Sequence, residues 1–167
     1  MMRDRFMTWF LSAVCLSGLV ATTVCAADMV VAPVSRVEVV LADQYRTQTA
    51  ALTEEFARAG LMNVHFQFAK LGHPPQNIGL GREVPAEQAR EAIRLAVKYN
   101  LGVGILLPQR LFPPRFVTIA SSNYDDTVET KIDHVALAQL QNPALSTEEF
   151  HRLYRALTTM NEAPGRY

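Results

Sequence analysis

Three arginines and one histidine are the residues of this chain whose types and spacing could support chemistry. Arg82 follows a Gly-x-Gly turn just before an expected helix, Arg110 and Arg115 lie in a proline-rich connection, and His73 lies in a loop. Guanidinium forks bind carboxylates and phosphates, and the free N–H groups at a helix N-terminus favour the same anions. The pattern therefore predicts a site for an anionic ligand.

No strong catalytic or metal-binding motif accompanies these residues. Gly79 and Gly81 lack the third glycine of a dinucleotide fingerprint and the Lys-Ser/Thr of a phosphate loop. None of the 4 histidines has the spacing of a metal ligand. His73, with Asp43 as its orienting acid, is the one pair that would suit a hydrolase-like enzyme, but no nucleophile accompanies it. We expect no catalytic residue, metal or cofactor, and keep that enzyme as the alternative.

The first 27 residues predict export. Arg3 and Arg5 form a positive start, residues 6–24 are mainly apolar, and small residues allow cleavage after Ala26 or Ala27. An uncleaved membrane anchor is the competing interpretation, because the apolar run reaches the length of about 20 residues that spans a bilayer. The expected location is the periplasm, with full secretion as the alternative.

Composition excludes two classes of partner. The chain has 167 residues with 16 basic and 16 acidic side chains, and the leader holds two arginines and one aspartate, which leaves 14 basic and 15 acidic residues. A net charge of −1 predicts neither nucleic acid nor, after cleavage, a membrane surface as partner. Both cysteines, Cys15 and Cys25, lie in the leader. The exported part must therefore be stable without a disulfide.

Hydrophobic patterning predicts one domain. We expect a linker over 28–34, a single globular domain over 35–160 and a flexible tail over 161–167. Alternating residues predict half-buried strands, and apolar residues at helical spacing predict helices. Gly60, Pro85 and the capping box of Ser146 and Glu149 mark helix ends. The expected strands cover 35–41, 63–70, 101–107 and 116–120, and the expected helices cover 43–59, 85–100, 135–140 and a C-terminal segment from 146.

This order predicts an α+β two-layer sandwich, with a mixed four-stranded sheet (β-α-β-α-β-β), helices on one face and an added C-terminal helix. Right-handed crossovers make the first three strands parallel, and the strand order is expected to be 1-2-3-4. The carboxyl ends of parallel strands share one edge, where ligands usually bind. The ligand-binding residues expected at that edge are Asp43, His73, Asn77, Arg82, Arg110 and Arg115.

Leu111 and Phe112 are the candidate partner-binding residues. Prolines flank this pair on the connection between two expected strands. If the pair is exposed, it forms a rigid apolar contact of the kind that partners use, and if it folds inward, it closes the end of the core.

Together these features predict an exported binding module, without enzymatic activity, for a partner protein or an anionic envelope ligand. The alternatives are the hydrolase-like enzyme and a steric scaffold or inhibitor that acts through its C-terminal helix. The sequence leaves the oligomeric state open.

Overall fold

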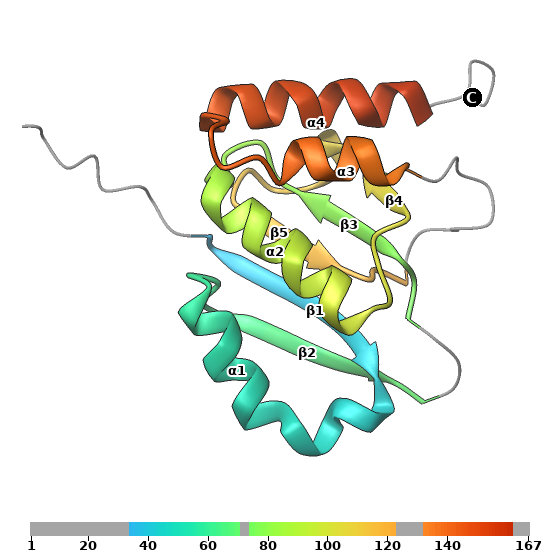
Figure 1. Ribbon diagram of the computed structural model, residues 1–167. Coiled ribbons are helices and arrows are strands. Elements are labelled where there is room, and N and C mark those ends of the chain that lie inside the picture. The colour runs from blue at the N-terminus through green and yellow to red at the C-terminus, as the bar shows by residue number, and fades with distance from the viewer. Residues whose placement is uncertain (1–33, 71–73, 123–131, 162–167) are drawn as a thin grey trace, which may run out of the picture. The chain divides into compact units, whose positions relative to one another are not determined.

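Two β-α-β units share one mixed sheet, and a fifth strand lies between them. The computed structural model describes residues 34–70, 74–122 and 132–161 (Figure 1). The strand order is β2-β1-β5-β3-β4, in which β1, β2 and β5 are parallel and β3 and β4 run in the opposite direction. The elements are β1 (Arg36–Ala42), η1 (Asp43–Gln48), α1 (Thr49–Arg58), β2 (Val64–Ala69), β3 (Asn77–Leu80), α2 (Ala86–Tyr99), β4 (Ile105–Leu107), η2 (Gln109–Leu111), β5 (Phe116–Ile119), α3 (His134–Leu140) and α4 (Thr147–Asn161).

The α+β class is confirmed, but the expectation of four strands in the order 1-2-3-4 was wrong. The segment Asn77–Leu80, which holds the first glycine of the expected Gly-x-Gly turn, forms strand β3. It pairs with β4 in a parallel ladder and with β5 in an antiparallel one. This added strand begins a second β-α-β unit. The third expected strand, at 101–107, corresponds to β4 of that unit and therefore runs opposite to β1 instead of parallel to it.

The helices α1 and α2 cover one face of the sheet. The side chains of Val37, Val39 and Leu41 point into this layer and are fully buried. Phe56 of α1 meets Phe66 of β2 edge to face, with ring centroids 5.3 Å apart. Both helices are right-handed crossovers, which places them on the same side (Figure 1). The core therefore lies between β1, its neighbours and this helix pair.

The predicted helix ends follow the local signals. Pro85 directly precedes α2, as its missing N–H allows. Gly60 has φ +73°, and the N–H groups of Gly60 and Leu61 donate to the carbonyls of Ala57 and Phe56, which is a Schellman motif. One start differs, because 43–48 forms the 3₁₀ turn η1 instead of the first turn of α1.

The C-terminal helix is part of the core. Ser146 and Glu149 form the expected capping box, in which the backbone N–H of Ser146 donates to Glu149 at 2.9 Å and the N–H of Glu149 donates to the Ser146 hydroxyl at 3.3 Å. Helix α4 packs against α2, α3 and β4, and its side chains Phe150 and Tyr154 are completely buried. The Tyr154 hydroxyl donates to carbonyls of β3 and β4, and so ties the helix to the sheet.

Several expectations fall outside the described residues. These are the leader, most of the linker, His73 and the last residues of the tail. Among the described helices, none has the length and apolar character needed to cross a bilayer.

Candidate functional site

The strand directions divide the expected ligand-binding edge between two opposite ends of the sheet. The carboxyl end of β1 carries Asp43, and because β3 is antiparallel to β5, its first residue Asn77 lies at the same end. Arg82, Arg110 and Arg115 lie at the other end, after β3, after β4 and before β5. The expectation that all these residues share one edge was wrong, because β4 does not run parallel to β1.

At the first end, the side chains serve local structure. Asp43 accepts a hydrogen bond from Nε of Arg46 at 2.8 Å. Asn77 is buried, donates to the carbonyl of Ser121 and accepts from its N–H, at 2.9 and 2.8 Å. These bonds join the start of β3 to the end of β5. The partner expected for Asp43, His73, lies outside the described residues.

At the other end, the proline-rich connection folds across the sheet face that α1 and α2 leave open. A Cβ built on Gly79 would lie 2.4 Å from the ring of Phe112, and one on Gly81 would lie 2.1 Å from the carbonyl oxygen of Pro113. The Gly-x-Gly of this segment therefore makes room for a neighbouring loop. The Phe112 ring also stacks on Phe116, with centroids 5.8 Å apart.

The two candidate partner-binding residues differ in environment. The Phe112 side chain is half-buried against the sheet, whereas the Leu111 side chain is 46% exposed. Phe112 thus closes the open face of the sheet at β3, and Leu111 is the more accessible member of the pair.

Beside Phe112 lies a depression of about 520 Å³, which we call the arginine depression. Its positive side chains come from three separate elements: the turn after β3, η2 and α4. Each guanidinium has five N–H donors, so it can bind a ligand oxygen while it keeps its contacts within the protein. The lining residues are Arg82, Gln109, Arg110, Phe112, Pro114 and Arg155.

A buried pair fixes one wall of the depression. Nε2 of His151 lies 2.7 Å from the carbonyl of Val84, so it carries the proton and donates. Nδ1 of His151 then accepts from Nε2 of Gln109, at 2.6 Å. Burial lowers the pKa of His151, and the charge of Arg155 lowers it further, against the opposing effect of the Val84 hydrogen bond.

The pairing of Gln109 with His151 leaves one hydrogen-bond acceptor, Oε1 of Gln109, without a donor among the described residues. Because Nε2 of Gln109 is used by His151, its Oε1 is buried without a hydrogen-bond partner among the described residues. Buried acceptors are rarely unpaired, since the lost hydration costs about 1–3 kcal/mol. Gln109 is thus the polar residue of the depression with an unmet requirement for a donor.

Sequence reasoning found Arg82, Arg110 and Phe112 of this site but missed Gln109 and Arg155. In the sequence of the last helix, Leu153 and Leu157 have the helical spacing of an inner stripe, but both side chains are only half-buried. Among the described side chains of α4, the buried ones are Phe150, His151, Tyr154 and Thr158, whose spacing is also helical. That alternative stripe was the signal that would have placed Arg155 beside the depression. Arg115, also expected here, is not among the lining residues, and its carbonyl accepts from Ser35.

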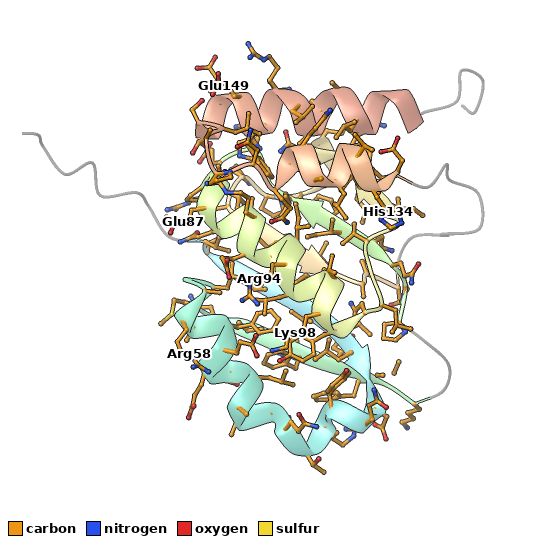
Figure 2. All side chains as sticks on the ribbon, in the orientation of Figure 1. Arg58, Glu87, Arg94, Lys98, His134 and Glu149 are labelled. Atoms are coloured by element: carbon orange, nitrogen blue, oxygen red, sulfur yellow. The ribbon has the colours of Figure 1, made fainter. Side chains whose placement is uncertain are left out.

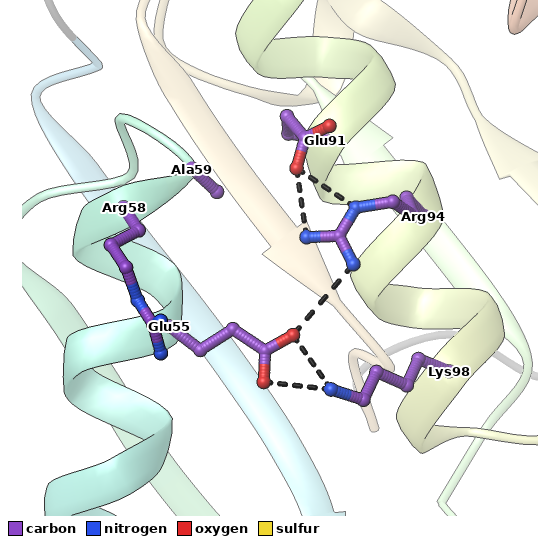
Figure 3. Close-up of a pocket in the computed structure, with 6 residues that line it drawn as sticks. All are labelled: Glu55, Arg58, Ala59, Glu91, Arg94 and Lys98. Carbon is purple, nitrogen blue, oxygen red and sulfur yellow. Dashed lines mark hydrogen bonds and ion pairs between the residues drawn. The ribbon is translucent and has the colours of Figure 1, made fainter.

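A second hollow, of about 380 Å³, lies between α1 and α2 (Figure 3). Both carboxylate oxygens of Glu55 lie 2.8 Å from Nζ of Lys98, and the Tyr99 hydroxyl donates to the same carboxylate at 2.5 Å. Arg94 lies 3.7 Å from Glu55 and 2.8 Å from Glu91. Figure 2 shows Arg94 and Lys98 on the side of α2 that faces α1. These charges bind one another, so the hollow ties two helices together and is a weaker ligand site than the arginine depression.

The described residues contain no group of three or more His, Cys, Asp and Glu side chains that could hold a metal ion. Comparison of the chain with protein-family models, with curated proteins and with solved structures found no match. The geometry of the site is therefore the only guide to its function.

Proposed function

We propose that the protein is a small exported binding module, without enzymatic activity, whose arginine depression receives an anionic group of an envelope ligand or partner protein. The observation that carries the proposal is the convergence of Arg82, Arg110 and Arg155 from three elements around one hollow. Residues that are far apart in the sequence meet there only because the chain folds.

The chemistry of the lining supports a ligand with more than a negative charge. Guanidinium groups bind carboxylate or phosphate oxygens, and the Phe112 ring offers an apolar surface beside them. A carboxylated sugar or an acidic peptide offers both a negative group and an apolar surface.

The test is a binding measurement with two defined probes. A peptidoglycan pellet assay and a fluorescence titration with an acidic, tyrosine-containing peptide distinguish an envelope polymer from a protein partner. We expect one probe to bind, and Arg82→Ala/Arg155→Ala to weaken that binding by at least about tenfold, since each charged hydrogen bond contributes about 1.5–3 kcal/mol.

Arg58→Ala is the matched control for each single variant, Arg82→Ala and Arg155→Ala. Like each of them it removes one positive charge, but Arg58 lies on α1 beside the other hollow (Figure 2). Arg82→Lys keeps the charge and loses the planar fork, so it separates charge from geometry. Equal binding by the wild-type chain and the double variant to both probes would contradict the proposed site.

The two alternative functions have less support. For the hydrolase-like enzyme, Asp43 is exposed and bound to Arg46, and no observation brings a nucleophile to it. For the scaffold that acts through its C-terminal helix, Phe150 and Tyr154 on α4 belong to the core. Removal of that helix would therefore open the core, so it is not a separable interaction element.

A further inference from the structure

The two edges of the sheet differ in how they are covered. Every residue of β4 is at most 2% exposed, α4 packs on this strand, and the carbonyl of Gly104 just before it accepts from Ile132 at 2.7 Å. Strand β2 forms the other border of the sheet, away from α3 and α4 (Figure 1). Its side chains are half-buried or exposed along the whole strand.

The register shows which backbone groups of β2 point outward. Val37 pairs with Val64, and the N–H of Val37 donates to the carbonyl of Asn63 at 3.2 Å. In a parallel ladder the bonded residues alternate, so the backbones of His65 and Gln67 face β1. The N–H and C=O groups of the residues between them point to the open edge. These outward residues are Val64, Phe66 and Phe68, and within the described ranges no hydrogen bond reaches their outer groups.

Strand β2 itself lacks the features that normally prevent pairing, and a cation beside it, Arg46 of η1, has its guanidinium 5.0 Å from the centroid of the Phe68 ring. Proteins protect an edge strand with a charged residue, a proline or a bulge. The sequence of β2 is Val-His-Phe-Gln-Phe-Ala, with no acidic residue, lysine, arginine or proline, and its pairing with β1 is continuous over the strand. On the helix side, the rings of Phe66 and Phe68 stack and remain half-buried.

We propose that β2 pairs with β2 of a second copy of this chain, in an antiparallel arrangement with the two-fold axis at Phe66. In this register the outward groups of Phe66 meet those of Phe66 in the other copy, and the groups of Val64 meet those of Phe68. Antiparallel strands bond at alternate residues, and the outward groups of β2 have that spacing.

The side chains of the strand are complementary to themselves in this register. Val64 lies beside Phe68 of the second copy on the helix side, and His65 lies beside Gln67 on the open side. Apolar residues thus meet apolar ones, and no like charges meet. This self-complementarity, together with the half-buried rings, favours a second copy over an unrelated strand as the occupant.

The test is the self-association of the chain purified from cells that express the full-length sequence, measured by sedimentation equilibrium over a wide concentration range. His65 and Gln67 are exposed, so substitutions there leave the core intact. His65→Lys/Gln67→Lys places like charges opposite each other at both pairs. His65→Lys/Gln67→Glu, which shares the change at His65, places opposite charges there.

We expect a dimer whose Kd is at least about tenfold higher for the lysine pair than for the lysine–glutamate pair, because like charges directly opposite each other weaken strand pairing and opposite charges strengthen it. Hydrogen exchange gives a second readout. The amide of Phe66 should exchange more slowly as concentration rises, whereas the amides of His65 and Gln67, already bonded to β1, should not change.

A chain that stays monomeric at high micromolar concentration would overturn the proposal and leave the edge to a strand of another protein. A dimer that responds equally to both double variants would also overturn it, because the contact would then lie elsewhere.

Discussion

The ring of Phe112 occupies the position that a side chain at Gly79 would need. The nearest ring carbons are 2.4 Å from a Cβ built on Gly79, and Cγ2 of Thr118 is 2.8 Å from the same point. A β-carbon does not fit into this space unless the loop or the strand moves. Packing therefore requires a glycine in the middle of β3. Without a side chain there, the loop that carries Arg110 and Phe112 can lie against the sheet.

Gly79→Ala should destabilise the fold by about 1–3 kcal/mol, the usual cost of overpacking, as measured by urea unfolding. Gly104→Ala is the control, because its Cβ would have no neighbour closer than 3.6 Å. In a Phe112→Ala background the cost of Gly79→Ala should shrink, since the clashing ring is gone. An unchanged cost in that background would show that the strain has another source.

Tyr154→Phe should lower stability by about 1–3 kcal/mol, because it removes the donor for two buried carbonyls. The hydroxyl lies 3.0 Å from the carbonyl of Ile78 and 2.9 Å from that of Leu107. Thermal unfolding monitored by circular dichroism measures the loss. Tyr99→Phe, which removes a hydroxyl from the half-buried ion network, should cost less. Equal costs would argue that the seam between β3 and β4 does not depend on this bond.

His151 should make the protein less stable as the pH decreases through the range in which histidine titrates in the unfolded chain. Burial lowers its pKa in the folded state, so the unfolded state binds the proton more tightly. This contribution to stability is fully present above about pH 6.5, the ordinary pKa of histidine, and is lost progressively as the pH decreases below it. The free energy of unfolding between pH 7.5 and 5.5 should therefore decrease less in His151→Gln than in the wild-type chain.

The Glu55 network should contribute a small, salt-sensitive stabilisation. Burial alone would raise the pKa of Glu55, but the hydrogen bonds from Lys98 and Tyr99 and the nearby positive charges lower it below the ordinary value. Glu55→Gln should cost less than about 1 kcal/mol at low salt, and less still in 1 M salt. Because the pKa is lowered, the contribution is present at neutral pH and is lost as the pH falls through the glutamate range. Glu54→Gln, at the neighbouring exposed position, is the control, and an identical loss there would contradict the assignment.

Local signals predicted the elements well, and the tertiary arrangement less so. The positions of β1, β2 and α2 and the cap at Ser146 follow from alternation, helical spacing and capping chemistry, which act over a few residues. Strand β3 was not predicted, because the spacing of Gly79 and Gly81 is typical of a turn. Their actual role depends on a loop about thirty residues further along, and no short-range pattern records that contact.

The same limit explains the partial prediction of the site. Arg82 and Arg110 were placed together correctly, although for a wrong reason, since the shared edge is set by the reversed unit of β3 and β4. Arg155 joins them because of the way α4 packs. The helix buries the face with Phe150 and Tyr154, and not the face with Leu153 and Leu157.

The unequal coverage of the two sheet edges sets a limit on assembly. A strand that pairs at β2 adds a copy whose far edge is β4, and that edge is already covered by α4 and by the backbone bond from Ile132. Growth from copy to copy therefore has no second attachment point, and a fibre cannot form by this route. A chain with one uncovered edge among its described strands would stop at the pair, and the arginine depressions of the two copies would then lie on opposite outer flanks.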